Sequence, residues 1–164
     1  ERTPKSKEVH MTTTADVIAA LNEALTAELT AVNQYAISAK TAADAGLTKL
    51  AAEYTAEIAG ESEHAQVLIE RILFLDGVPN MSRLFEVGVG DTAIAQFELN
   101  YAMERRAVTR YRDLVALCTA AGDPGSRLLA EKILLDEEHH VDEAAAHLRR
   151  KEAIGDALWL AQWA

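Results

Sequence analysis

The sequence predicts an all-α fold: a four-helix bundle with one long crossover between its second and third helices and a short fifth helix at the C-terminus. Three observations lead to this prediction. Glycine and proline, which interrupt helices, number only 8 and 3 among 164 residues. Four long stretches place apolar residues three and four positions apart, as on the buried face of a helix. The breaks between these stretches contain glycine or proline.

The first half of the chain gives two helices. Residues 1–10 are polar and aperiodic and Met11 resembles a natural start, so we interpret 1–10 as an N-terminal extension or cloning remnant. The first helix starts with the capping residues 12–14 and runs to about Ala45, where Gly46 ends it. The second spans about 47–75 and stops at Asp76 and Gly77.

The second half gives two more long helices and a tail. The third helix covers about 91–120. Pro124 is well placed at the start of the fourth, which runs to about Glu152. The bundle therefore occupies residues 11–152. Gly155 separates a short amphipathic helix within residues 153–164.

The lengths of the connections predict the topology. Short links after the first and third helices indicate antiparallel hairpins. Residues 77–90 are enough to climb the height of the bundle, so the third helix can run parallel to the second. Four helices of about 28 residues, each about 40 Å long, with one long crossover match the ferritin-like arrangement.

Each buried stripe contains a glutamate near the middle of its helix: Glu28, Glu61, Glu104 and Glu137. An ionised carboxylate buried without a partner costs several kcal/mol or takes up a proton. Four of them need a common counter-charge, which a pair of divalent metal ions supplies.

Two histidines strengthen the metal prediction. Glu61 is followed three residues later by His64, and Glu137 by His140. Side chains at i and i+3 reach the same point beside a helix. A Glu-x-x-His motif on two helices and one glutamate on each of two others, Glu28 and Glu104, is the di-iron or di-manganese carboxylate pattern.

The sequence leaves two possible roles open for several neighbouring residues. Asp136 and His139 would form a shifted register, but Lys132 on the same stripe argues against it. Tyr35 faces the core, where ordinary packing and a redox role both remain open. Glu57 lies one turn before Glu61 and is either an outer partner of the ligands or an exposed acid.

Composition excludes several classes of function. A formal net charge of −10 argues against nucleic acid as a partner and suits a protein that attracts cations. The lone Cys118 excludes an internal disulfide and a four-cysteine metal site. No apolar run approaches the roughly 20 residues of a membrane span, and no secretion signal is recognisable, so we expect a cytoplasmic protein without membrane partners.

From about residue 11 to 162 the chain resembles the bacterioferritins, most clearly over residues 21–35, 69–80 and 136–142. The resemblance implies a ferroxidase centre with two iron ions per subunit. Glu28 and His64 would be terminal ligands of one iron, Glu104 and His140 of the other. Glu61 and Glu137 would bridge the two ions.

The resemblance also implies a function and an assembly. Fe(II) would be oxidised by O2 or H2O2, and the ferric mineral would be stored in a homo-oligomeric cage of 24 subunits built from dimers. Asp136, just before a bridging glutamate, would orient His64. Asp44, Asp76 and Asp142 would meet at a junction between subunits and form a pore for iron.

Two departures from the family pattern matter. Bacterioferritins hold haem between paired subunits on a methionine that directly follows the bridging glutamate of the second helix. Here Ser62 stands there, and a hydroxyl is a poor haem ligand, which argues against haem binding. Gly60 replaces a residue that is often acidic, which predicts that His140 lacks a matching outer partner.

Other functions fit the same ligands. A di-iron oxidase or oxygenase with an organic substrate would need an apolar pocket beside the metals. A haem-free subunit of a mixed cage, with a haem-binding subunit as partner, is a second alternative. A rubrerythrin-like peroxidase would need cysteine pairs, which this chain lacks.

Overall fold

The computed structural model describes residues 12–164, so the predicted extension at residues 1–10 lies outside the described residues. The described part contains five α-helices and no strand, which confirms the all-α prediction. The helices are α1 (Thr14–Asp44), α2 (Thr48–Phe74), α3 (Ala93–Ala120), α4 (Pro124–Ile154) and α5 (Asp156–Ala161). Helix α4 thus extends two residues beyond the predicted Glu152.

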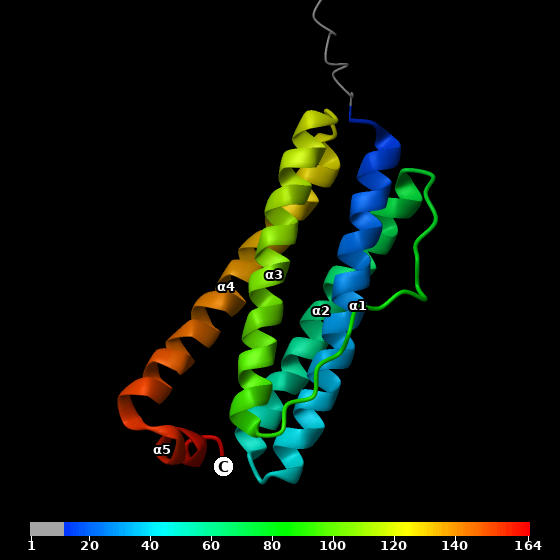
Figure 1. Ribbon diagram of the computed structural model, residues 1–164. Helices are drawn as coiled ribbons and strands as arrows, with labels where there is room; N and C mark the ends of the chain where they lie inside the picture. The colour runs from blue at the N-terminus through cyan, green and yellow to red at the C-terminus, as the bar shows by residue number, and fades with distance from the viewer. Residues whose placement is uncertain (1–11) are drawn as a thin grey trace, which may run out of the picture.

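The helices form two antiparallel hairpins joined by a crossover (Figure 1). Short turns join α1 to α2 and α3 to α4. Residues 75–92 carry the chain along α1 from one end of the bundle to the other, so α3 runs parallel to α2. Helix α5 lies across the end of the bundle. This is the ferritin-like bundle that the connection lengths predict.

Capping residues explain where the helices begin and end. Thr13 and Asp16 form a capping box at the start of α1, and Asp123 caps α4 ahead of Pro124. Both hairpin turns use a glycine with positive φ, Gly46 at 77° and Gly122 at 68°. The left-handed conformation lets the next backbone N–H reach a carbonyl of the last helical turn, as usual at helix ends.

Two apolar clusters fill the bundle. One contains Leu21, Leu25 and Leu68, and the other contains Leu50, Phe97 and Trp159. All four predicted glutamates are buried but belong to neither cluster. No helix of the described residues is long and apolar enough to cross a membrane.

A buried amide network fixes the crossover to the bundle. The side chain of Gln34 donates to the carbonyl of Gly88 and accepts from its N–H, both at 2.8 Å. Gln96 accepts from the N–H of Gly90 at 2.8 Å. Asn100 accepts from Gln34 at 3.1 Å and ties the network to α3. The end of the crossover is therefore held against α1 and α3, close to the glutamates.

Candidate metal centre

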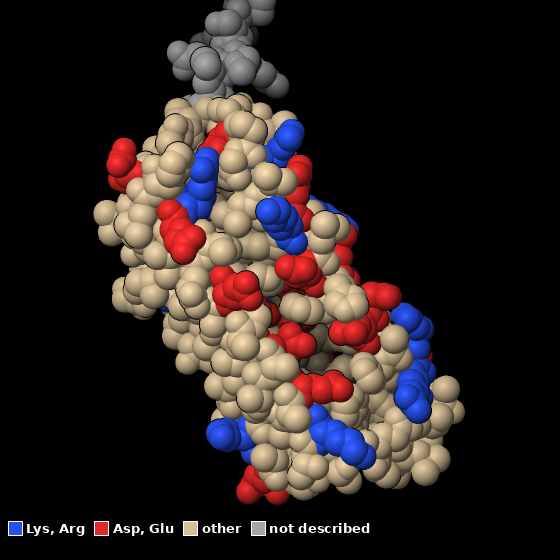
Figure 2. All heavy atoms as spheres, turned by 180° about the vertical axis from the view of Figure 1, so that it is seen from behind, with Lys and Arg blue, Asp and Glu red and all other residues tan. Residues whose placement is uncertain are grey.

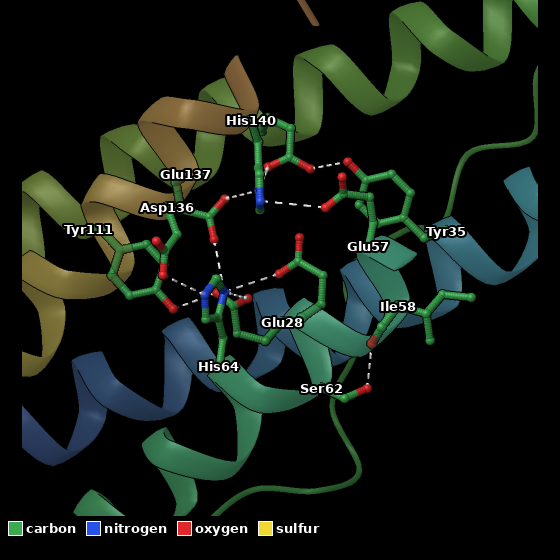
Figure 3. Close-up of polar contacts among 12 residues, drawn as sticks. Glu28, Tyr35, Glu57, Ile58, Ser62, His64, Tyr111, Asp136, Glu137 and His140 are labelled. Carbon is green, nitrogen blue, oxygen red and sulfur yellow. Dashed lines mark hydrogen bonds and ion pairs between the residues drawn. The ribbon is translucent and has the colours of Figure 1, made fainter. Parts of the chain in front are cut away.

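The structure brings all six predicted ligands together near the middle of their helices. Figure 3 shows Glu28, His64, Glu137 and His140 directed toward one another. Each helix contributes from its buried stripe: α1 gives one glutamate, α3 gives one glutamate, and α2 and α4 each give a glutamate and a histidine. The carboxylate residues are only 1–2% exposed. The six residues are Glu28, Glu61, His64, Glu104, Glu137 and His140.

The ligand atoms form two overlapping groups, in each of which all atoms lie within 4.8 Å of one another. Glu28 and His64 belong to the first group only. Glu104 of α3 and His140 of α4 belong to the second group only. Glu61 and Glu137 belong to both. Two adjacent ions that share two carboxylates would fit this arrangement.

Each histidine turns one nitrogen toward the carboxylates and the other away. Nδ1 of His64 lies 3.2 Å from Glu137 Oε1 and 3.4 Å from Glu61 Oε2. Its Nε2 lies 3.4 Å from Asp136 Oδ2, as expected for an orienting carboxylate. The inward Nδ1 is therefore free to bind a metal if the outward Nε2 carries the proton.

His140 has the same arrangement. Its Nδ1 lies 3.7 Å from Glu104 Oε2 and 3.8 Å from Glu137 Oε2. Its Nε2 lies 3.5 Å from Oε2 of Glu57. The prediction that His140 lacks an outer partner is therefore wrong. Position 57 lies on the same face of α2 as Glu61, one turn earlier, so its side chain reaches the ring.

Two tyrosines donate hydrogen bonds to the glutamates of α1 and α3, the two helices that contribute one ligand each. The hydroxyl of Tyr35 donates a short hydrogen bond to Glu104, and the hydroxyl of Tyr111 donates one of 2.5 Å to Glu28. The contact of Tyr111 was missed by sequence reasoning. A signal was present, because Tyr111 follows Glu104 by seven residues, just as Tyr35 follows Glu28.

The inward atoms lack hydrogen-bond partners among residues 12–164. They include Glu61 Oε2, both oxygens of Glu137 and Nδ1 of both histidines. Buried polar atoms without partners are costly, and here they face one another. Carboxylate oxygens and imidazole nitrogens suit iron or manganese, so the donor set fits a di-iron site.

Without a cation the cluster holds protons. Burial, together with the charges of Glu28 and Glu137, raises the pKa of Glu61, and burial raises the pKa of Glu104 to about 7. Although burial lowers it, the neighbouring carboxylates raise the pKa of His140 to about 11. Metal ions that bind through these atoms must displace such protons.

The cluster lies beneath a cavity on the α1–α3 side. This cavity of about 580 Å³ reaches all four glutamates and is also lined by Phe85, Leu99 and Met103. A small cavity of about 60 Å³, lined by Glu53, Glu57 and His140 among others, lies on the α2–α4 side. Figure 2 views the molecule from that side and shows acidic side chains gathered around a hollow.

Other predicted positions are not part of the cluster. The Ser62 hydroxyl donates to the carbonyl of Ile58 at 2.6 Å and points away from the glutamates (Figure 3). Serine here does not fit axial haem ligation. His139 is exposed and lies 3.3 Å from Glu143, so the shifted register is wrong.

The three pore candidates are exposed and do not meet within one chain. Asp44 ends α1, whereas Asp76 follows the end of the antiparallel α2. A helix of this length separates them by about 40 Å. Asp142 lies on α4, five residues beyond Glu137. Only contacts between subunits can bring these carboxylates together.

Residues 18–154 match the model of the ferritin-like domain family. The chain is 45% identical to the bacterioferritin of Streptomyces coelicolor over 145 residues, which is 88% of this chain and 87% of that protein. It is 40% identical to bacterioferritin BfrA of Mycobacterium tuberculosis, covering 90% and 92% of the two chains. A solved mycobacterial bacterioferritin superposes with a TM-score of 0.88 at 43% identity, covering 90% and 92%.

Proposed function

Because this chain belongs to the ferritin-like domain family and, within it, to the bacterioferritins, we propose that it oxidises ferrous iron at the four-helix centre and stores the ferric product in a protein cage. One observation carries the proposal: two groups of buried ligand atoms share Glu61 and Glu137. Such sharing suits two ions acting together and is unnecessary for a single structural metal.

Each ligand has a role in this proposal. Glu28 and His64 bind one ferrous ion, and Glu104 and His140 bind the other. Glu61 and Glu137 bridge the pair, as expected from their place in both groups. These roles match the division of the six residues between the two sides of the cluster.

Two ferrous ions supply two electrons. With O2 and two protons they give two ferric ions and H2O2; with H2O2 and two protons they give two ferric ions and two water molecules. The chain holds the ions in fixed geometry, with Tyr35 and Tyr111 restraining the two single glutamates. Asp136 holds His64 with Nδ1 facing the iron.

Replacement of one bridging residue tests the centre. In Glu137→Ala we expect loss of fast ferrous oxidation, measured by stopped-flow absorbance, with unchanged helix content. Glu138→Ala is the matched control, because Glu138 is the next residue and pairs at the surface with Arg112. Wild-type oxidation by Glu137→Ala would show that the site lies elsewhere.

Storage requires a hollow assembly. We propose a cytoplasmic 24-mer built from dimers, either of this chain alone or mixed with a haem-binding subunit. With chains of 17.8 kDa the homo-oligomer has a mass of roughly 430 kDa. Native mass spectrometry tests this, since a stable monomer or dimer at all concentrations would contradict storage while leaving the metal centre intact.

The exposed acids Asp44, Asp76 and Asp142 are the proposed pore for iron between subunits. A funnel of negative charge concentrates cations. Replacing Asp44 and Asp76 together with asparagine should slow growth of the mineral and spare the first turnover at the centre. Unchanged mineral growth would remove the pore from the proposal.

One observation favours a second candidate function, a di-iron oxidase or oxygenase with an organic substrate. The cavity of about 580 Å³ beside the glutamates is partly lined by the apolar side chains of Phe85, Leu99 and Met103. Iron would then remain at the centre through many turnovers. Stoichiometric oxidation of added iron, with mineral retained in a large particle, distinguishes storage from this alternative.

A further inference from the structure

The outer partners of the two histidines come from different helical positions. On α4, the residue immediately before the shared glutamate is Asp136, which contacts His64. The equivalent residue on α2 is Gly60, which has no side chain. Instead, Oε2 of Glu57 lies 3.5 Å from Nε2 of His140 (Figure 3).

We propose that Glu57 is the positioning residue of His140, with the role on the α2 side that Asp136 has for His64. This inference rests on the proposed ferroxidase function and deepens it. Glu57 precedes Glu61 by four residues, so the two carboxylates lie one turn apart on one face of α2. From there Glu57 reaches the outward nitrogen of the ring, while Glu61 faces the cluster.

The ion pair of Glu57 and His140 is partly sheltered from water. The side chains of Glu57 and His140 are 29% and 17% exposed, whereas that of Asp136 is 64% exposed. A carboxylate sheltered from water interacts more strongly with a neighbouring imidazole than an exposed one does. We therefore expect the ion pair with Glu57 to hold the ring of His140 in place.

The chemical role follows from the tautomers of imidazole. When a metal ion displaces the proton from Nδ1 of His140, the proton that stays on Nε2 faces Glu57, and Nδ1 presents its lone pair toward Glu104 and Glu137. Without Glu57 the ring can take the other tautomer, whose proton blocks the metal-binding nitrogen. Loss of such an outer partner typically lowers metal affinity by about 10–100-fold.

Anaerobic titration of the assembled, metal-free protein with Co²⁺ tests the proposal. Wild type should bind two Co²⁺ per subunit. In Glu57→Ala the Kd of one of the two ions should rise by about 10–100-fold, with the other changed less than about twofold. Glu53→Ala is the matched control, because Glu53 lines the same small cavity one turn earlier, and it should bind as wild type does.

A relocated carboxylate provides a rescue. A Cβ added at Gly60 would meet nothing within 4 Å, so this position accepts a side chain. Gly60→Asp places a carboxylate directly before Glu61, as Asp136 stands before Glu137. Combined with Glu57→Ala, it should restore most of the lost affinity. No recovery, with helix content intact, would contradict a positioning role.

The outcomes separate this inference from the proposed function. If wild type fails to bind two Co²⁺ per subunit, the ferroxidase proposal itself is wrong. If wild type binds two and Glu57→Ala also binds two with unchanged affinity, the ferroxidase proposal stands and the role of Glu57 is overturned. An equal loss in Glu53→Ala would show a general effect of charge and would likewise overturn it.

Discussion

The hydroxyl of Tyr111 on α3 donates a hydrogen bond of 2.5 Å to Oε1 of Glu28 on α1. The reciprocal bond runs from Tyr35 on α1 to Glu104 on α3. The two helices are antiparallel, and each carries a tyrosine seven residues after its glutamate. Each tyrosine therefore reaches the glutamate of the other helix, and the centre has approximate two-fold symmetry.

Tyr111→Phe removes one of these bonds without changing the shape of the ring. We expect the metal-free protein to lose about 1.5–3 kcal/mol of stability, the usual range for a hydrogen bond to a charged group. Urea unfolding measures the change. Tyr101→Phe, on the same helix with its ring 5.9 Å from the guanidinium of Arg105, is the control. Equal losses in both variants would contradict a specific contact.

Glu61→Gln should separate stability from activity. Burial and the charges of Glu28 and Glu137 raise the pKa of Glu61, so its ionised form is unfavourable in the metal-free fold. At neutral pH the folded, metal-free protein therefore keeps a proton on Glu61 that the unfolded chain releases, and a neutral amide of similar shape removes the cost of taking up that proton. We expect a Tm higher by about 2–4 °C for each kcal/mol relieved, and slow ferrous oxidation. Calorimetry of metal-free protein measures the change, and a lower Tm would contradict the argument.

The ion pair of Arg71 and Asp123 predicts acid sensitivity. The two side chains lie 2.6 Å apart, less than 20% exposed, where the end of α2 meets the start of α4. Burial opposes ionisation of Asp123, but hydrogen bonds from Ser126 and the charge of Arg71 outweigh it, so the pKa lies below its usual value of 3.8.

Because the folded pKa is depressed, this contribution is complete above pH 3.8 and is lost as the pH falls through the folded value. Asp123→Asn should cost about 1–3 kcal/mol at pH 7, and the difference from wild type should shrink toward pH 2. Thermal unfolding across pH measures both. A constant difference would show that only shape matters at this position.

Gln34→Leu should release the crossover. The N–H of Gly88 would lose its partner, and its carbonyl would keep only the long bond of 3.5 Å from Gln96, at about 1–3 kcal/mol for each group left unpaired in a buried site. We expect faster amide hydrogen exchange at Gly88 and lower stability of the protein. Asn33→Leu is the control, since the Asn33 amide bonds only within α1 and is exposed. Unchanged exchange would mean that the other contacts of the crossover, such as the hydrogen bond from Gly90 to Gln96, hold it without Gln34.

Ser62→Met should create haem binding. The Ser62 hydroxyl now bonds to its own helix at Ile58, whereas a thioether is an effective axial ligand. Haem titration followed by Soret absorbance should give about one haem per pair of subunits. No gain would mean that other residues close the pocket.

The regular part of the fold and the six clustered residues were predictable because both depend on local rules. The helical period places Glu28 and Glu104 on buried stripes. A buried carboxylate needs a counter-charge, so these positions indicate a metal site. The breaks at Gly46 and Pro124 mark short connections, and a short connection makes the two helices that it joins antiparallel neighbours.

The contacts that the sequence left open or missed depend on how the helices are rotated against each other. The sequence leaves Glu57 open as an outer partner or an exposed acid, because no sequence period says which turn of α2 faces the ring of His140. Gln34 holds Gly88 in a crossover that has no periodicity. Tyr111 lay on a buried stripe, where a tyrosine is usually only a packing residue.

Burying four carboxylates links the lifetime of the folded chain to the supply of its substrate. A cation that binds only the folded state stabilises it by mass action, by about 2.7 kcal/mol at 100 times its Kd. At low ferrous iron the buried carboxylates must hold protons instead, so the folded state is less stable and the chain unfolds more often, which exposes it to proteases. Iron abundance would then set not only the work of this protein but also the number of copies that persist.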